Sequence, residues 1–195
     1  MTRSEASPDI ANGRLLDDYL VVAAQAGDAR AFADLVRRWR RRLLAHAWRL
    51  TGDDEAASDA VQAAWLEIAR GLPRLKDERA FAAWAYRIVT RRCAREISGL
   101  KDRRELARAL AVQPTPDPTP APDVDPTGDV GRLRAAIRTL PPAQRAALAL
   151  FHFEDLSIPE IAVALDVPAG TIKTRLMHAR RRLRAVLEGD DHDLS

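Results

Sequence analysis

The sequence predicts an all-α protein with two small helical domains joined by a flexible linker rich in proline and aspartate. Alanine, leucine and arginine dominate the 195 residues, aromatic residues make up 5%, and long β-branched runs are absent, a composition that favours helices. Half of the 12 prolines lie between residues 111 and 131. On both sides of that segment, apolar residues recur at steps of three and four, as on one face of a helix.

Four helical segments are expected in the first domain, residues 15–110, after a disordered tail at 1–14. The first three end close to glycines, which commonly terminate helices, and the break after the third also contains Pro73. Tryptophans recur among their apolar positions, and the simplest interpretation of this stripe is core packing in a helical bundle. The expected segments are 17–26, 29–50, 53–69 and 78–97.

The fourth segment has a second, basic face. Arg87, Arg91 and Arg95 follow one another at four-residue steps, and Arg92 lies beside them. Residues four apart share a helix face, so this segment presents a row of positive charge away from its apolar side.

The linker, residues 111–131, contains six prolines, four aspartates and no basic residue. Such a segment cannot bury apolar surface, so we expect it to be extended and solvated. It is either a passive tether or an acidic strand that itself occupies a basic channel in a partner, and the sequence leaves both open.

The second domain, residues 132–187, contains a predicted helix-turn-helix. Ser157 with Glu160 three residues later forms a capping box, and Pro159 falls in the first turn, where a missing N–H costs little. Residues 166–168 break the chain before a second helix begins near Ala169. A turn this short sets two helices across each other.

The second of these helices is basic on one side. From Ala169 to Arg184 there are six basic residues and no acidic one, while Ile172, Leu176 and Ala179 recur on the apolar face. This pattern indicates a DNA-reading helix; the alternative is a helical hairpin with a solvated basic face. The exposed candidates are Lys173, Thr174, Met177, His178 and Arg181.

The modest net charge of +3 hides an uneven distribution. Residues 15–110 carry 19 basic against 14 acidic side chains, and residues 132–187 carry ten against four. Two basic domains are thus separated by an acidic connector, and the local field governs attraction to nucleic acid. The acidic tail, 188–195, is either a solubilising end or a shield for the preceding basic helix.

Neither a cofactor nor a metal is expected. Cys93 is the single cysteine, which excludes an internal disulfide and a cysteine-rich zinc site and suits a reducing cytoplasm. The four histidines lie far apart without other ligands at metal-binding spacing. The first 14 residues do not resemble a signal peptide, and no apolar run is long enough to span a bilayer, so we expect neither export nor membrane insertion.

Several spaced motifs together resemble bacterial RNA polymerase sigma factors of the sigma-70 family. The run from Leu140 to Arg145, and the helix-turn-helix with its Gly170-Thr171-Ile172-Lys173 sequence, resemble region four of that family. The runs 51–53, 59–65 and 81–88 resemble region two. With only these two regions and a short linker, the chain resembles the extracytoplasmic-function (ECF) group.

The resemblance implies a division of roles between the domains. The first domain is expected to bind the polymerase core at its β′ clamp through Asp59, Val61, Gln62 and Trp65. The same domain is expected to read the minus-ten element, and to capture a flipped base, through Lys76, Arg79, Arg87, Arg91, Arg92 and Arg95. The β flap of the polymerase core is a further expected contact. The second domain is expected to read the minus-thirty-five element through Thr171, Lys173, Thr174, Arg175, Met177, His178 and Arg181.

The expected function is therefore transcription initiation at specific promoters, in which the protein also assists strand opening. We expect it in the bacterial cytoplasm, and on the nucleoid when it is active. An anti-sigma factor is a further partner that the resemblance implies. The alternative is a helix-turn-helix regulator that binds an operator without polymerase, although neither a ligand pocket nor a dimer seam is evident. An enzyme acting on nucleic acid is disfavoured, because the acidic residues are scattered rather than clustered for catalysis.

Overall fold

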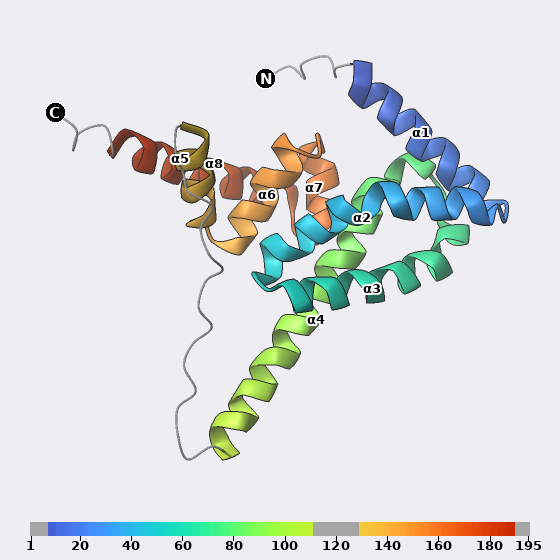
Figure 1. Ribbon diagram of the computed structural model, residues 1–195. Helices are drawn as coiled ribbons and strands as arrows, with labels where there is room; N and C mark the ends of the chain where they lie inside the picture. Colours follow the sequence, from blue (N-terminus) through green and yellow to red (C-terminus); the bar gives the residue numbers. More distant parts are fainter. Residues whose placement is uncertain (1–7, 111–128, 190–195) are drawn as a thin grey trace.

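A computed structural model of the chain describes residues 8–110 and 129–189, and within these ranges the regular elements are all helical (Figure 1). The first domain contains α1 (Pro8–Gln25), α2 (Ala29–Thr51), α3 (Asp54–Gly71) and α4 (Phe81–Leu110), with the 3₁₀ turns η1 (Leu72–Arg74) and η2 (Glu78–Ala80) before α4. The second contains α5 (Asp129–Arg138), α6 (Pro142–His152), α7 (Ile158–Leu165) and α8 (Ala169–Gly189). The predicted all-α fold is confirmed.

Several helix boundaries differ from the expected ones. α1 begins at Pro8, within the range expected for the tail, and α4 continues to Leu110 instead of ending at residue 97. α5 and α6 were not predicted, and α5 begins at Asp129, inside the last residues of the expected linker. The rest of the linker and residues 190–195 of the tail lie outside the described residues.

Caps explain why several helices begin and end where they do. The Asp28 carboxylate accepts hydrogen bonds from the backbone N–H groups of Arg30 and Ala31, and Gly52 ends α2 with a φ of 71°, which a glycine adopts without strain. The predicted capping box is present: the N–H of Ser157 donates to Glu160 at 2.6 Å, and the N–H of Glu160 donates to the Ser157 hydroxyl.

The core of the first domain is built around three aromatic rings. Trp39 of α2 packs edge-on against Phe81 and Tyr86 of α4, with ring centroids 5.2 and 5.8 Å apart, and all three side chains are buried. Edge-to-face geometry adds to the stability that apolar burial provides. Trp39 is buried in this core, and Trp48, Trp65 and Trp84 are half-buried and pack against it, as predicted for the tryptophan stripe.

The two domains pack against each other. α2 contacts α6, and α4 contacts α7, so that one continuous cluster of buried apolar residues runs through both domains. The last part of α4 extends away from this body (Figure 1). Among the described residues, no helix is long and apolar enough to cross a membrane.

Candidate nucleic-acid interface

The second helix of the helix-turn-helix, α8, separates an apolar from a basic face. Ile172, Leu176 and Ala179 are fully or almost fully buried against the second domain, in agreement with the predicted stripe. Its opposite side carries the candidate DNA-reading residues. Lys173, Thr174, Met177 and Arg181 are exposed, and Thr171, Arg175 and His178 are half-buried.

Local contacts orient part of this face. The Thr174 hydroxyl donates to the carbonyl of Gly170 at 3.1 Å, and Arg181 lies 3.3 Å from Nδ1 of His178. Lys173 and Arg175 make no ion pair with a described carboxylate. The start of α8 therefore presents cations and hydroxyl groups to a ligand, and groups of this kind bind phosphates and base edges in a major groove.

A second basic surface lies beside the start of α4. A cavity of about 490 Å³ there is lined by α3, the segment after it and α4, and it includes Lys76, Arg87 and Arg91 among the predicted residues. All three side chains are exposed. Its other lining residues are Glu67, Gly71, Arg74, Leu75, Trp84 and Ile88.

Trp84 is the residue of this cavity that the sequence reasoning missed. Its half-buried ring packs against the core as predicted, with its centroid 6.2 Å from that of the buried Phe81, but it also lines the cavity. The signal was available, because Trp84, Arg87 and Arg91 follow at steps of three and four on one helix face. Gly71 makes room for its ring: a Cβ at Gly71 would lie 2.8 Å from Cζ2 of Trp84.

The remaining predicted minus-ten residues lie elsewhere. Arg92 is half-buried and donates two hydrogen bonds to Glu67, at 2.6 and 3.0 Å, so it fixes a carboxylate of the cavity wall. Arg95 is exposed four residues further along α4. Arg79 lines a different cavity, together with Asp18 and Glu78.

A third surface lies between α2 and α3, where the core-binding residues were expected. Asp59 and Gln62 are exposed and Trp65 is half-buried, but Val61 is only 5% exposed and belongs to the core. A cavity of about 490 Å³ brings Val61, Gln62 and Trp65 together with Leu44 and Leu66. Leu66 is 62% exposed; it was missed because one leucine on a polar helix face carries no periodic signal.

Two family models match the chain, Sigma-70 region 2 at residues 35–104 and Sigma-70, region 4 at residues 131–183. The ECF RNA polymerase sigma factor SigM of Mycobacterium tuberculosis is 34% identical over 172 residues, covering 88% of this chain and 84% of SigM. This protein belongs to the ECF group of the sigma-70 family. It is an RNA polymerase-associated transcription initiation factor, and the alternative of an independent operator-binding regulator is not favoured.

Other relatives of this sigma factor agree with that assignment. RNA polymerase sigma-H factor of Pseudomonas aeruginosa is 29% identical, covering 88% of this chain and 94% of the relative. The sigma factor RpoE of Bartonella quintana, solved in complex with the anti-sigma factor NepR, has a TM-score of 0.63 at 20% identity, covering 82% of this chain and 98% of that one. CnrH, solved with the cytosolic domain of CnrY, has a TM-score of 0.61 at 24% identity, covering 90% and 99%. These structures share its fold.

Proposed function

We propose that this sigma factor directs polymerase core to promoters through the three surfaces described above. α8 reads the minus-thirty-five element, the cavity beside Trp84 receives an unpaired base of the minus-ten element, and the groove between α2 and α3 docks on the β′ clamp. The observation that carries the proposal is the presence of separate basic surfaces on two domains, each on a helix whose opposite face is buried. When both DNA-binding domains are held on one polymerase, each meets its promoter element at a high effective concentration. Neither domain therefore needs a strong affinity for DNA by itself.

The first test is reconstitution. Purified protein and bacterial core polymerase are incubated with sheared genomic DNA, and the RNA 5′ ends are sequenced. We expect transcripts that depend on the sigma factor and share upstream elements at two fixed spacings. Equal 5′ ends with and without the protein contradict the proposal.

The minus-thirty-five role is supported by the exposed cations at the start of α8. Each phosphate contact contributes a salt-dependent increment to affinity. For Lys173→Ala we expect uniformly weaker promoter binding and a salt slope smaller by about 1. Arg37→Ala is the matched control, because Arg37 is exposed on α2 and pairs with Asp34 in its own helix. An equal loss in both variants contradicts a specific role of α8.

The minus-ten role is supported by the chemistry of the cavity beside Trp84. An aromatic ring stacks on an unpaired base, which is worth about 1–3 kcal/mol, and Arg87 and Arg91 at the rim can bind its phosphates. The Glu67 carboxylate, held by Arg92, can accept a hydrogen bond from an exocyclic amine. Arg79 and Arg95 lie outside this cavity, and for them we propose contacts to the flanking backbone.

A fluorescent base tests this pocket. With 2-aminopurine placed at successive minus-ten positions of the non-template strand, one position should change in fluorescence when the holoenzyme opens the promoter. Trp84→Ala should abolish that change and slow strand opening, while Trp84→Phe should retain most of it. Identical signals in wild type and Trp84→Ala rule the pocket out.

The docking role is supported by the apolar rim of the groove between α2 and α3. Charged substitution of an exposed apolar residue disrupts an interface only if the residue lies in it. Leu66→Arg should therefore lower affinity for core polymerase at least tenfold, whereas Leu15→Arg should not, although both leucines are similarly exposed, at 62% and 66%. For the second domain we propose contact with the β flap.

We also propose an anti-sigma partner, since the related fold from Bartonella quintana was solved with an anti-sigma factor, and we propose that this partner contacts both domains. A cavity of about 560 Å³ supports this, because residues of both domains line it, Trp48 and Arg49 from α2 and Phe153 after α6 among them. A photo-crosslinking amino acid at Phe153 should capture the partner in the native bacterium, and one at Leu15 should not. Capture at Leu15 alone contradicts this site.

A further inference from the structure

Glu67 is the only acidic residue among the described residues that line the cavity beside Trp84. The other charged residues of the wall are Arg74, Lys76, Arg87 and Arg91. Because a carboxylate repels phosphates, Glu67 weakens the attraction of these cations for a nucleic-acid backbone. A carboxylate in this place is therefore suited to a ligand group that donates hydrogen bonds, and not to a phosphate.

Arg92 holds only one of the two Glu67 oxygens. Nε and Nη2 of Arg92 both donate to Oε2, at 3.0 and 2.6 Å, and two hydrogen bonds fill the lone pairs of that oxygen. Oε1 accepts no hydrogen bond from the described part of the chain. Arg92 itself is not among the residues that line the cavity. The guanidinium therefore fixes the carboxylate from outside the cavity and leaves Oε1 available to a ligand.

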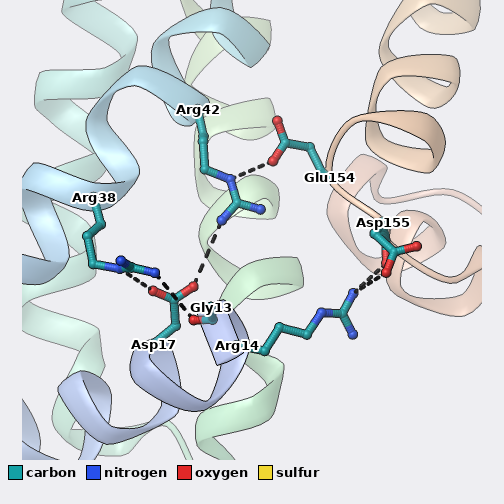
Figure 2. A network of polar contacts seen from close by, with 7 residues as sticks. All are labelled: Gly13, Arg14, Asp17, Arg38, Arg42, Glu154 and Asp155. Carbon is teal, nitrogen blue, oxygen red and sulfur yellow. Dashed lines mark hydrogen bonds and ion pairs between the residues drawn. The ribbon is translucent and has the colours of Figure 1, made fainter. Parts of the chain in front are cut away.

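Asp17 of α1 shows how a carboxylate is held where the protein engages both of its oxygens. Oδ1 accepts a hydrogen bond from Arg38 at 2.8 Å, Oδ2 lies 3.9 Å from Arg42, and the side chain is only 10% exposed (Figure 2). Arg42 in turn donates to Glu154 of the second domain at 2.6 Å. The Glu67 side chain is 33% exposed and has one arginine partner. Glu67 thus differs from a carboxylate in a wholly structural environment, because the described residues leave one of its oxygens without a partner.

The exocyclic group of a base decides whether the base can pair with this oxygen. Cytosine and adenine carry an amine, N4 or N6, at the position where thymine and guanine carry a carbonyl oxygen, O4 or O6. An ionised carboxylate only accepts hydrogen bonds, so it binds the amine and repels the carbonyl oxygen. Stacking on an aromatic ring such as Trp84 tolerates every base. The selectivity of the cavity then depends on Glu67.

We propose that Glu67 selects the base that enters the cavity. Oε1 accepts a hydrogen bond from the exocyclic amine of cytosine or adenine while the ring of the base stacks on Trp84, and thymine and guanine are rejected. Arg92 acts as a positioning residue, because its two hydrogen bonds to Oε2 hold the carboxylate in place. This inference rests on the proposed minus-ten role of the cavity, and it names the class of base that the cavity takes.

A promoter with a premelted minus-ten region tests this selectivity. Its template strand carries mismatches there and an abasic site opposite the tested base, so that exchanging this base leaves the cost of strand opening nearly unchanged. The tested position is the one whose 2-aminopurine signal depends on Trp84. Cytosine, adenine, thymine, guanine and 2-pyrimidinone, which is cytosine without its amine, are placed there in turn. Competition binding to the holoenzyme at saturating core polymerase gives the relative affinities.

For the wild-type holoenzyme we expect cytosine and adenine to be bound about tenfold more tightly than thymine and guanine, which is the size expected for one hydrogen bond to a charged acceptor. Loss of the amine alone should account for most of this difference, so that 2-pyrimidinone is bound at least about fivefold more weakly than cytosine. A wild type that binds 2-pyrimidinone as tightly as cytosine, or that prefers thymine or guanine, overturns the proposal. This measurement needs no variant that has to fold.

Three variants separate selection of the base from packing. Glu67→Gln, whose amide donates as well as accepts, should reduce the preference to about threefold or less. It should also bind the thymine promoter at least as tightly as the wild type, because a charge that repels phosphates is lost. Arg92→Lys keeps the positive charge but cannot direct a rigid fork of two N–H groups at Oε2, so its preference should lie between those of the wild type and Glu67→Gln. The control Asp34→Asn removes a carboxylate that forms a 2.7 Å ion pair with Arg37 within α2, and it should keep the full preference.

The outcomes separate this inference from the proposed function. Full preference in Glu67→Gln, or an equal loss in Asp34→Asn, overturns selection by Glu67, and full preference in Arg92→Lys overturns the positioning role. A signal that depends on Trp84 without any base preference refutes the inference alone. If no minus-ten position gives such a signal, the cavity receives no base, and the proposed minus-ten role fails together with the inference.

Discussion

Acidification should destabilise this protein through His46, which lies fully buried between α2 and α4. Its Nε2 is 3.0 Å from the Thr90 hydroxyl, and that hydroxyl donates to the carbonyl of Tyr86. Nε2 must therefore donate, which leaves Nδ1 unprotonated, and Nδ1 is buried without a hydrogen-bond partner. Burial, together with the nearby charge of Arg49, lowers the pKa of His46 from 6.5 to about 3.

The direction of the change in stability with pH follows from how many protons the folded and unfolded states bind. The folded protein holds His46 neutral down to about pH 3, while the unfolded chain takes up a proton below about pH 6.5. The unfolded state therefore binds more protons in this window, and stability falls as the pH falls through it. Between pH 7 and pH 5 the loss from this one group is about 2 kcal/mol, since each pKa unit corresponds to about 1.4 kcal/mol.

Urea unfolding at pH 7 and pH 5 measures this loss in the wild type and in His46→Gln, which cannot take up the proton. We expect the variant to be less stable at pH 7 but to lose about 2 kcal/mol less on acidification. His152 titrates in both proteins and cancels in the comparison. An identical pH dependence in the two proteins refutes the assignment of the pH effect to His46.

Three further predictions concern packing and reactivity. Gly71→Ala should destabilise the first domain by about 1–3 kcal/mol, because the new Cβ meets the Trp84 ring; chemical denaturation measures this, and an unchanged midpoint contradicts the close contact. Ser157→Ala should cost about 0.5–2 kcal/mol through loss of the capping box, again by urea titration, and Ser157→Asp should restore most of it. Burial raises the pKa of Cys93 to about 12, so an aromatic disulfide reagent at pH 8 should modify it at the rate of unfolding rather than within seconds.

The helix-turn-helix was predictable because its signals are local. The capping box, the apolar stripe of α8 and the break at residues 166–168 all lie within about 30 residues, and each matches an element of the structure. Short-range signals of this kind need no knowledge of the rest of the fold. The family resemblance then supplied the order of the two domains, and the family models for regions 2 and 4 match the chain in that order.

The contacts between the domains were not predictable in the same way. Arg42 and Glu154 are 112 residues apart. No local sequence pattern indicates which distant carboxylate an arginine on a basic helix will pair with. α6 was missed because its start has no side-chain cap and carries Pro141 and Pro142, which resemble a break in the chain rather than the beginning of a helix. The second role of Trp84 was missed because periodicity distinguishes the faces of a helix but does not show that a residue packed against the core also lines a cavity.

The apolar cluster that runs without interruption from α2 into α6 and α7 has a consequence for engineering. Chimeras that fuse one half of this chain to the other half of a relative change both sides of that seam at once. A chimeric sigma factor made in this way needs matched residues on both sides of the interface between its domains. Without them the interface contains cavities and unpaired buried charges. If α8 reads the promoter as proposed, exchanging its outward side chains alone is the simpler way to transfer promoter preference.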